Sequence, residues 1–180
     1  GKEFVDYGVK HAKLILLREI CKRQTAFDAP KFQHFRQDNS YWLQDYALFK
    51  VLKEYHEGRP WYEWEDQYKN RDPEALESFR KYHDEEIMFQ MWVQWQLSKQ
   101  FKDAKEYAAS RNIILKGDLP ILVSRDSADV WMHPYYFKLE YAAGAPPDMY
   151  CAKGQRWGMP TYNWERIATD NFRYLKERLK

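Results

Sequence analysis

The stretch between Glu74 and Asn112 constrains the fold most, because it contains neither glycine nor proline. It follows Asp72-Pro73, where a capping carboxylate precedes a proline at the first helical position, so a helix is predicted to start there. The stretch is predicted to form one helix of roughly 55 Å or two helices with a kink near Ser98. Its predicted buried stripe recurs at spacings of three and four residues and consists of Leu76, Phe79, His83, Ile87, Met91 and Trp95.

An apolar run with β-branched residues follows this stretch and predicts a different element. Ile113-Ile114-Leu115 leads into Lys116-Gly117-Asp118-Leu119-Pro120, which is typical of a buried strand over about residues 113–119 with Asp118 at its carboxyl end. One strand cannot form a sheet by itself. The chain is therefore interpreted as a helix-rich piece of a larger α/β fold, and its start at Gly1 without an initiator methionine agrees with that interpretation.

The carboxylate of Asp118 has two interpretations. The carboxyl ends of strands carry the active site in α/β barrels, so Asp118 is a candidate for substrate contact or catalysis. Alternatively, it caps the turn at Asp126-Ser127. The spacing of these residues leaves both interpretations open.

The remaining elements are shorter, and periodicity and capping signals predict them. Helices are expected from Val9 to about Arg23, after a cap at Ser40, and from Phe172 to Leu179 behind a cap at Asp170. The apolar stripe expected in the first of these helices consists of Val9, Ala12, Leu16 and Ile20. The buried stripe expected after Ser40 consists of Leu43, Tyr46, Ala47, Val51 and Tyr55. Glycines and prolines predict an irregular loop within about residues 141–162. The expected division is a helical subdomain at 1–72 and a segment at 73–180 that holds the long helix, the strand, the loop and the last helix.

Composition and missing motifs exclude several classes of function. A net charge of +2 argues against a strongly basic nucleic-acid binder. The longest aliphatic run, Leu14 to Leu17, is too short to cross a membrane. The two cysteines show no Cys-x-x-Cys spacing, which favours a reducing compartment, so a cytoplasmic location is expected. No ligand spacing of histidines and no nucleotide-binding or serine-hydrolase motif occurs, so no metal or cofactor is predicted.

Aromatic residues make up 18% of the chain. Those in predicted helices, such as Trp42, Trp92 and Trp95, are assigned to the core, since large rings dominate buried area. Those in loops lie among glycine and proline and are interpreted as surfaces for sugar rings, whose apolar C–H faces stack on aromatic planes. These loop aromatics are Trp61, Tyr62, Trp64, Tyr150, Trp157 and Tyr162.

Several ordered motifs resemble one family, the 4-alpha-glucanotransferases, also called amylomaltases or disproportionating enzymes, which are glycoside hydrolases. The motifs span essentially the whole chain: Val5-Asp6-Tyr7-Gly8, Tyr41-Trp42-Leu43-Gln44-Asp45-Tyr46, Trp61-Tyr62-Glu63-Trp64, Gly117-Asp118-Leu119-Pro120-Ile121, Gly144-Ala145-Pro146-Pro147-Asp148 and Gly154-Gln155-x-Trp157-Gly158. The resemblance implies a (β/α)₈ TIM barrel with helical insertions. It also implies transfer of α-1,4-glucan segments between maltooligosaccharide or starch acceptors by a retaining mechanism.

The resemblance also implies roles for individual residues. Asp118 matches an Asp that contacts glucan at the end of the third barrel strand, and Asp148, Gln155 and Trp157 match residues of the loop that guides the glucan. Tyr7 resembles a Tyr at a second glucan site. The family's nucleophile lies in an Arg-x-Asp-His motif that does not occur here, so the chain is expected to hold no catalytic residue and to be inactive alone. The alternative is a non-catalytic helical module that binds glucan or another protein.

Overall fold

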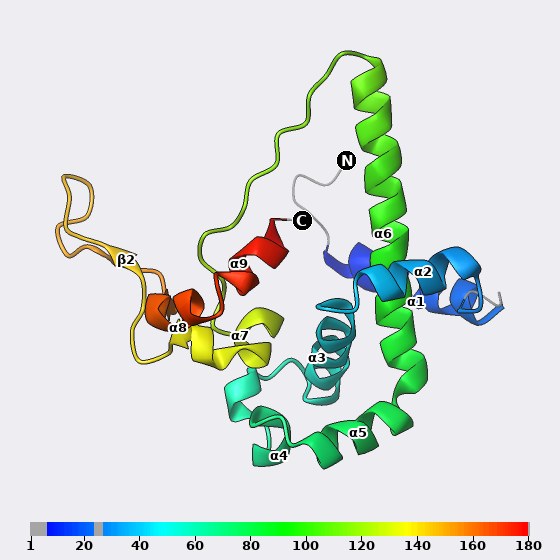
Figure 1. The fold of residues 1–180 in the computed structure, drawn as a ribbon, viewed down its shortest axis with the longest axis horizontal. Helices are drawn as coiled ribbons and strands as arrows, with labels where there is room; N and C mark the ends of the chain where they lie inside the picture. Colours follow the sequence, from blue (N-terminus) through cyan, green and yellow to red (C-terminus); the bar gives the residue numbers. More distant parts are fainter. Residues whose placement is uncertain (1–6, 24–26, 180) are drawn as a thin grey trace. The chain divides into compact units, whose positions relative to one another are not determined.

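The computed structural model describes residues 7–23 and 27–179, and within that part the chain is rich in helices (Figure 1). It divides into two compact units, the first made of residues 1–51 and 79–113 and the second of residues 52–78 and 114–180. Two of the three boundaries pass through the helices α3 (Leu43–Tyr55) and α5 (Pro73–Tyr82), and the third follows Ile113. The units therefore follow different ranges from the expected segments 1–72 and 73–180.

The helices expected near the N-terminus are present in the first unit. The helix expected from Val9 is α1 (Tyr7–Arg23), although Val9, Leu16 and Ile20 of its stripe are exposed and Cys21 is buried. In α3, Leu43 and Ala47 are buried as expected, whereas Tyr55 at the last helical position is exposed. The stripe of α3 therefore forms part of the core, and the stripe of α1 does not.

A helix that the sequence did not predict packs in the same unit. α2 (Pro30–Asp38) lies within the polar stretch that precedes α3, and Pro30 occupies its first turn, where the missing N–H costs no hydrogen bond. Phe32 of α2 is fully buried, and its ring centroid lies 5.5 Å from that of Trp95 in α6 (Asp84–Ser110). A single large ring therefore anchors a helix whose other residues are mostly polar.

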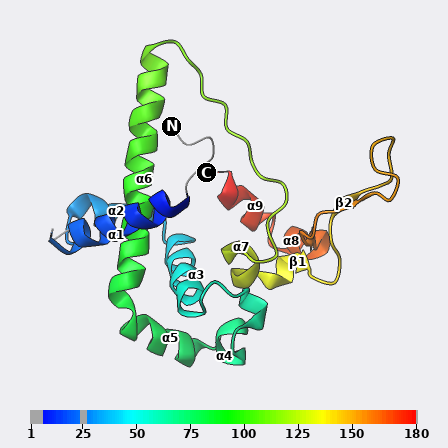
Figure 2. The ribbon, with the colours of Figure 1, turned by 180° about the vertical axis from the view of Figure 1, so that it is seen from behind.

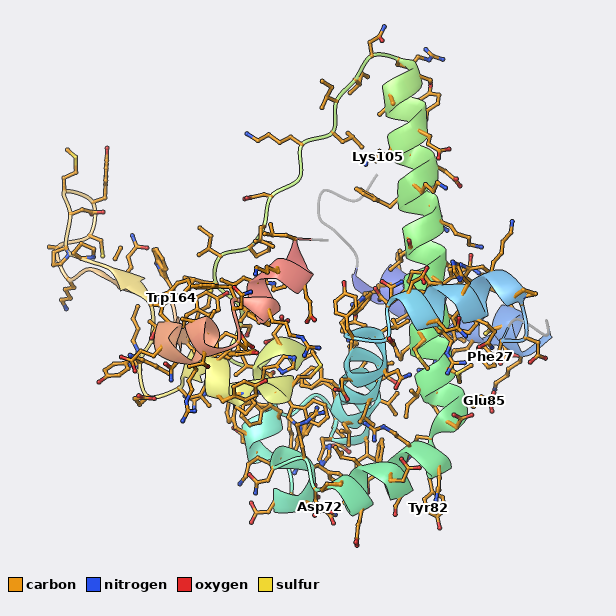
Figure 3. All side chains as sticks on the ribbon, viewed as in Figure 1. Phe27, Asp72, Tyr82, Glu85, Lys105 and Trp164 are labelled. Carbon is orange, nitrogen blue, oxygen red and sulfur yellow. The ribbon has the colours of Figure 1, made fainter. Side chains whose placement is uncertain are left out.

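The long glycine-free stretch is divided into two helices, and the break falls at His83 instead of near Ser98. α5 starts at the predicted position, because the Ala75 N–H donates to Asp72 Oδ1 at 2.9 Å. Figure 3 labels Asp72 before α5 and Tyr82 at its end. His83 leaves the helical conformation with φ −118° and ψ 27°, and the acids Asp84-Glu85-Glu86 then occupy the positive end of α6. The acidic cluster indicates a new helix start, which was missed because the predicted apolar stripe continues through His83.

The strand predicted over residues 113–119 is not formed. These residues follow the end of α6 without regular structure, as Figure 1 shows, and Ile114 is 91% exposed. A strand exists only where a neighbour accepts and donates its backbone hydrogen bonds. None of the strands among the described residues pairs with residues 113–119.

The second unit combines short helices with two short antiparallel pairs, where an irregular loop was predicted. β1 (Phe137–Lys138) pairs with β4 (Thr161–Tyr162). Between these two strands in the sequence, β2 (Gly144–Ala145) pairs with β3 (Gln155–Arg156). The last helix, α9 (Arg173–Arg178), lies within the range predicted for it, Phe172 to Leu179. The helical elements of this unit, besides parts of α3 and α5, are η1 (Trp61–Glu63), α4 (Asp66–Lys69), α7 (Ala128–Met132), η2 (Pro134–Tyr136), α8 (Trp164–Thr169) and α9 (Arg173–Arg178).

Three of the loop aromatics interpreted as sugar-facing are instead part of the core of the second unit. Trp61, Trp64 and Tyr162 are buried. The indole N–H groups of Trp61 and Trp64 donate to the backbone oxygens of Arg125 (2.7 Å) and Arg59 (3.0 Å). Because each polar edge finds a backbone acceptor, the rings can be buried without an unsatisfied donor.

Candidate functional site

The β2–β3 hairpin carries three of the side chains that the sequence singled out. Its ladder pairs Gly144 with Arg156 and Ala145 with Gln155. The Trp157 N–H extends it by donating to the Ala143 oxygen at 3.0 Å, and the Ala143 N–H donates to the Met159 oxygen at 2.7 Å. Figures 1 and 2 show the hairpin projecting away from α8. The stem is thus hydrogen-bonded, and its tip is open to solvent.

Two glycines allow the hairpin strands to approach closely. A Cβ on Gly144 would overlap the backbone oxygen of Gln155. Gly154 has a φ of +70°, and a Cβ there would lie 2.7 Å from the Ala145 oxygen. These glycines therefore make a tight hairpin possible, which is the opposite of the irregular loop that their presence predicted.

Asp148 shapes the tip of the hairpin. Its Oδ1 accepts the backbone N–H groups of Tyr150 (2.9 Å) and Cys151 (2.7 Å), which is the geometry of an Asx turn. The Cys151 thiol donates to the Gly154 oxygen at 3.1 Å and closes the other side of the tip. Met149 and Tyr150 are each 88% exposed. The carboxylate of Asp148 therefore fixes the backbone that presents Tyr150 to solvent.

Gln155 and Trp157 lie on one face of the hairpin and contact each other. Residues two apart in an extended strand point to the same side. The Trp157 indole N–H donates to Gln155 Oε1 at 3.0 Å, while the Trp157 side chain remains 48% exposed. The hydrogen bond holds the edge of the indole, so an aromatic surface of defined orientation faces solvent.

Asp118 and Tyr7 lie outside the hairpin. Asp118 belongs to the same compact unit as the hairpin and is exposed in the segment without regular structure that joins α6 to α7. Tyr7 is the first residue of α1 in the other unit, and its side chain is outside the described residues. The structure therefore joins Gln155 and Trp157 on the hairpin whose tip Asp148 shapes, whereas Asp118 lies in another segment of the same unit and Tyr7 belongs to the other unit.

The turn at Asp126-Ser127 is held by partners other than Asp118. Asp126 pairs with Lys53 at 2.5 Å and accepts the backbone N–H of Trp61 at 3.3 Å. Ser127 caps α7 by accepting the Val130 N–H at 3.3 Å. The capping interpretation of Asp118 is therefore wrong, and its carboxylate is exposed to solvent.

Sequence reasoning assigned no role to the side chains of α9, yet Tyr174 contacts α7 and Arg178 contacts the segment beside Asp118. Tyr174 is buried and donates to Asp129 Oδ1 at 2.9 Å. Burial, together with the charge of Asp129, raises the pKa of Tyr174, so this hydroxyl stays protonated. Arg178 donates to the Pro120 oxygen at 3.0 Å across 58 residues of sequence. No local pattern signals a contact over such a separation.

No group of His, Cys, Asp or Glu side chains in the described residues is arranged to hold a metal ion. Among the described helices, none is both long and apolar enough to cross a membrane.

Comparison with known proteins places the chain in a family. The glycoside hydrolase family 77 model, described as 4-alpha-glucanotransferase, matches residues 2–180. The 4-alpha-glucanotransferase of Aquifex aeolicus is 40% identical, over 91% of this chain and 34% of its own length. The 4-alpha-glucanotransferase DPE2 of Oryza sativa subsp. japonica is 37% identical, over 99% of this chain and 19% of its own length. The structure of amylomaltase from Streptococcus agalactiae in complex with acarbose superimposes with a TM-score of 0.89 and 32% identity, over 99% of this chain and 38% of that one. The chain thus spans less than two fifths of each relative.

Proposed function

The chain belongs to the 4-alpha-glucanotransferase family, and we propose that the protein containing it transfers α-1,4-glucan segments between maltooligosaccharide or starch acceptors. The family match over residues 2–180 supports this activity. The related amylomaltase that was solved with acarbose supports an α-glucan as the ligand. The β2–β3 hairpin is the part of this chain that the proposal assigns to glucan binding.

The observation that carries the proposal is the half-exposed indole of Trp157, held at its edge by Gln155. A sugar ring presents apolar C–H groups on its faces, and a flat aromatic surface can cover them while water is excluded. The Gln155 amide has two N–H donors to offer to sugar hydroxyls. The hairpin thus combines stacking and hydrogen bonding, the two interactions that a glucose unit requires.

Asp118 and Tyr7 complete the proposed binding residues. The exposed carboxylate of Asp118 accepts hydrogen bonds from glucan hydroxyls. The segment that carries it becomes a barrel strand where other parts of a larger (β/α)₈ fold supply backbone hydrogen bonds, which places Asp118 at a carboxyl end, where barrel active sites lie. Tyr7 belongs to a second glucan site at the start of α1.

The bond-breaking groups are assigned to parts of the protein outside this chain. A retaining mechanism needs a carboxylate nucleophile and a carboxylic acid about 5–5.5 Å apart. In this proposal Asp148 shapes a turn and Asp118 binds substrate, so neither is the nucleophile. The chain contributes binding and orientation, and it is inactive by itself.

Maltotriose given to the full-length protein tests the proposal. A transferase converts maltotriose into glucose and maltodextrins longer than maltotriose, both visible by chromatography. Glucose and maltose without any longer product would show hydrolysis and would contradict transfer.

A second function, a helical module that binds glucan without chemistry, has the exposed hairpin in its favour. Retardation of the full-length protein in a glycogen-containing gel, with no change in maltotriose, would support this second function. Retardation together with longer products supports the transferase.

A further inference from the structure

Side chains from two elements of the second unit form hydrogen bonds to the backbone carbonyl groups that follow Leu119 in the Asp118 segment. The Tyr162 hydroxyl, at the end of β4, donates to the Ile121 oxygen at 2.5 Å. The Arg178 guanidinium, in α9, donates through Nη2 to the Pro120 oxygen at 3.0 Å. Two neighbouring backbone acceptors are therefore held by side chains that lie 41 and 58 residues away in sequence.

The side chains of Tyr162 and Arg178 are also hydrogen-bonded to each other. Arg178 Nη1 donates to the hydroxyl oxygens of Tyr162 (3.2 Å) and Tyr174 (3.3 Å). Each hydroxyl donates its single hydrogen onward, to the Ile121 oxygen from Tyr162 and to Asp129 from Tyr174, and accepts from the guanidinium. Donors and acceptors match at every link, so the guanidinium orients both hydroxyls.

Tyr162 connects this network to the base of the hairpin. It pairs with Phe137 in the β1–β4 ladder, and the two ring centroids lie 5.4 Å apart. The chain between β1 and β4 is the part that forms the β2–β3 hairpin. One buried side chain thus contacts both the strand pair that supports the hairpin and the backbone three residues after Asp118.

Resting on the proposed glucan transfer, we propose that Tyr162 and Arg178 are positioning residues, which hold the backbone at Pro120 and Ile121 and thereby fix the Asp118 carboxylate for glucan bound at the hairpin. Neither residue contacts the substrate in this proposal. Both act through Asp118, which makes their effect conditional on that carboxylate.

A double-mutant cycle in the full-length protein tests this dependence. Tyr162→Phe keeps the ring against Phe137 and removes only the hydroxyl, and Arg178→Lys keeps the charge but loses the fork that reaches three acceptors. Each change is expected to lower kcat/KM for maltotriose about fivefold, the effect of one lost hydrogen bond. In an Asp118→Asn background the same changes are expected to cost less than about twofold. Equal losses in both backgrounds would overturn the proposal.

A matched control lies on the same helix. Arg173 of α9 is exposed and bonds to Glu177 at 2.9 Å, one turn away. Arg173→Lys makes the same chemical change as Arg178→Lys and is expected to leave kcat/KM unchanged. A loss equal to that of Arg178→Lys would mean that α9 acts through general charge, and it would overturn the role of the Arg178 contacts.

Hydrogen exchange separates this proposal from the proposed function. Exchange at the backbone N–H groups of Ile121 and Leu122 in the full-length protein, followed by mass spectrometry, reports how firmly the backbone after Asp118 is held. Tyr162→Phe and Arg178→Lys are expected to speed this exchange severalfold, because each removes a contact to this backbone, and Arg173→Lys is not. Faster exchange in a protein that makes no longer maltodextrins would support the positioning contacts while the transferase assignment fails. Unchanged exchange would overturn the positioning contacts even where transfer is intact.

Discussion

The β2–β3 hairpin and the segment at residues 113–121 both carry proposed glucan-binding side chains, but they obtain their order differently. The hairpin holds its own strands together through Ala143, Trp157 and the Asp148 turn. The segment has exposed apolar side chains and is held near its end by Tyr162 and Arg178. A binding residue on the hairpin thus depends on contacts close in sequence, whereas Asp118 depends on contacts distant in sequence.

The largest expected effect comes from closing the space between the hairpin strands. In Gly144→Ala the new Cβ overlaps the Gln155 oxygen, and overpacking of this kind costs about 1–3 kcal/mol. Hydrogen exchange at the Trp157 N–H, which donates to Ala143, is expected to speed up about tenfold or more.

The matched control for this change lies in the other region. Nothing lies within 4 Å of a Cβ added to Gly117, so Gly117→Ala is expected to leave exchange at Trp157 unchanged. A Gly144→Ala protein with wild-type protection at Trp157 would show that close strand contact is not what orders the hairpin.

A smaller effect is expected from the Asp148 turn. Asp148→Ala removes the acceptor of the Tyr150 and Cys151 N–H groups, at a cost of about 1 kcal/mol, as for a lost helix cap. Transfer from maltotriose is expected to fall about fivefold. Asp148→Asn keeps a side-chain oxygen for both donors and is expected to stay near wild type. An Asn variant as weak as the Ala variant would show that the charge itself contacts glucan.

The smallest effect is expected from the pairing of Glu65 with His56 in the second unit. Glu65 Oε2 lies 2.5 Å from His56 Nε2, and this hydrogen bond lowers the pKa of Glu65. A carboxyl whose pKa is lower in the folded state stabilises the fold above its unfolded pKa of about 4.3, and that contribution disappears as the pH falls through the folded pKa. Glu65→Gln is therefore expected to be slightly less stable than wild type at neutral pH, with the gap closing in acid. Urea unfolding of both proteins from pH 7 to pH 3 measures the difference in their free energies of unfolding. A difference that does not change with pH would contradict the pairing of Glu65 with His56.

Sequence predicted what depends on neighbours along the chain. The start of α5 at Asp72-Pro73 and the α3 stripe at Leu43, Ala47 and Val51 were predicted correctly because capping and periodicity act over a few residues. The break at His83 was placed wrongly because the apolar stripe continues through it while the acids that restart the helix lie on other faces.

The errors in the candidate site concern partners distant in sequence. The strand predicted over residues 113–119 requires a neighbour that the described residues do not contain. Trp61 and Tyr162 were assigned to sugar rings because glycine and proline surround them, but their acceptors lie 64 and 41 residues away. Gln155 was identified through the family resemblance, and Trp157 both through the resemblance and as an aromatic in a loop. The hydrogen bond between them became visible only in the structure.

The most direct test of glucan binding by the hairpin is to measure the affinity of the protein for a maltooligosaccharide. Maltoheptaose is titrated into the full-length protein by calorimetry, with Trp157→Ala compared with Tyr82→Ala, an exposed aromatic at the end of α5. Loss of an aromatic contact of about 1.4 kcal/mol is tenfold in Kd, so the Kd of Trp157→Ala is expected to rise about tenfold while that of Tyr82→Ala matches wild type. A Trp157→Ala protein that binds maltoheptaose as tightly as wild type would contradict the assignment of the hairpin to glucan binding.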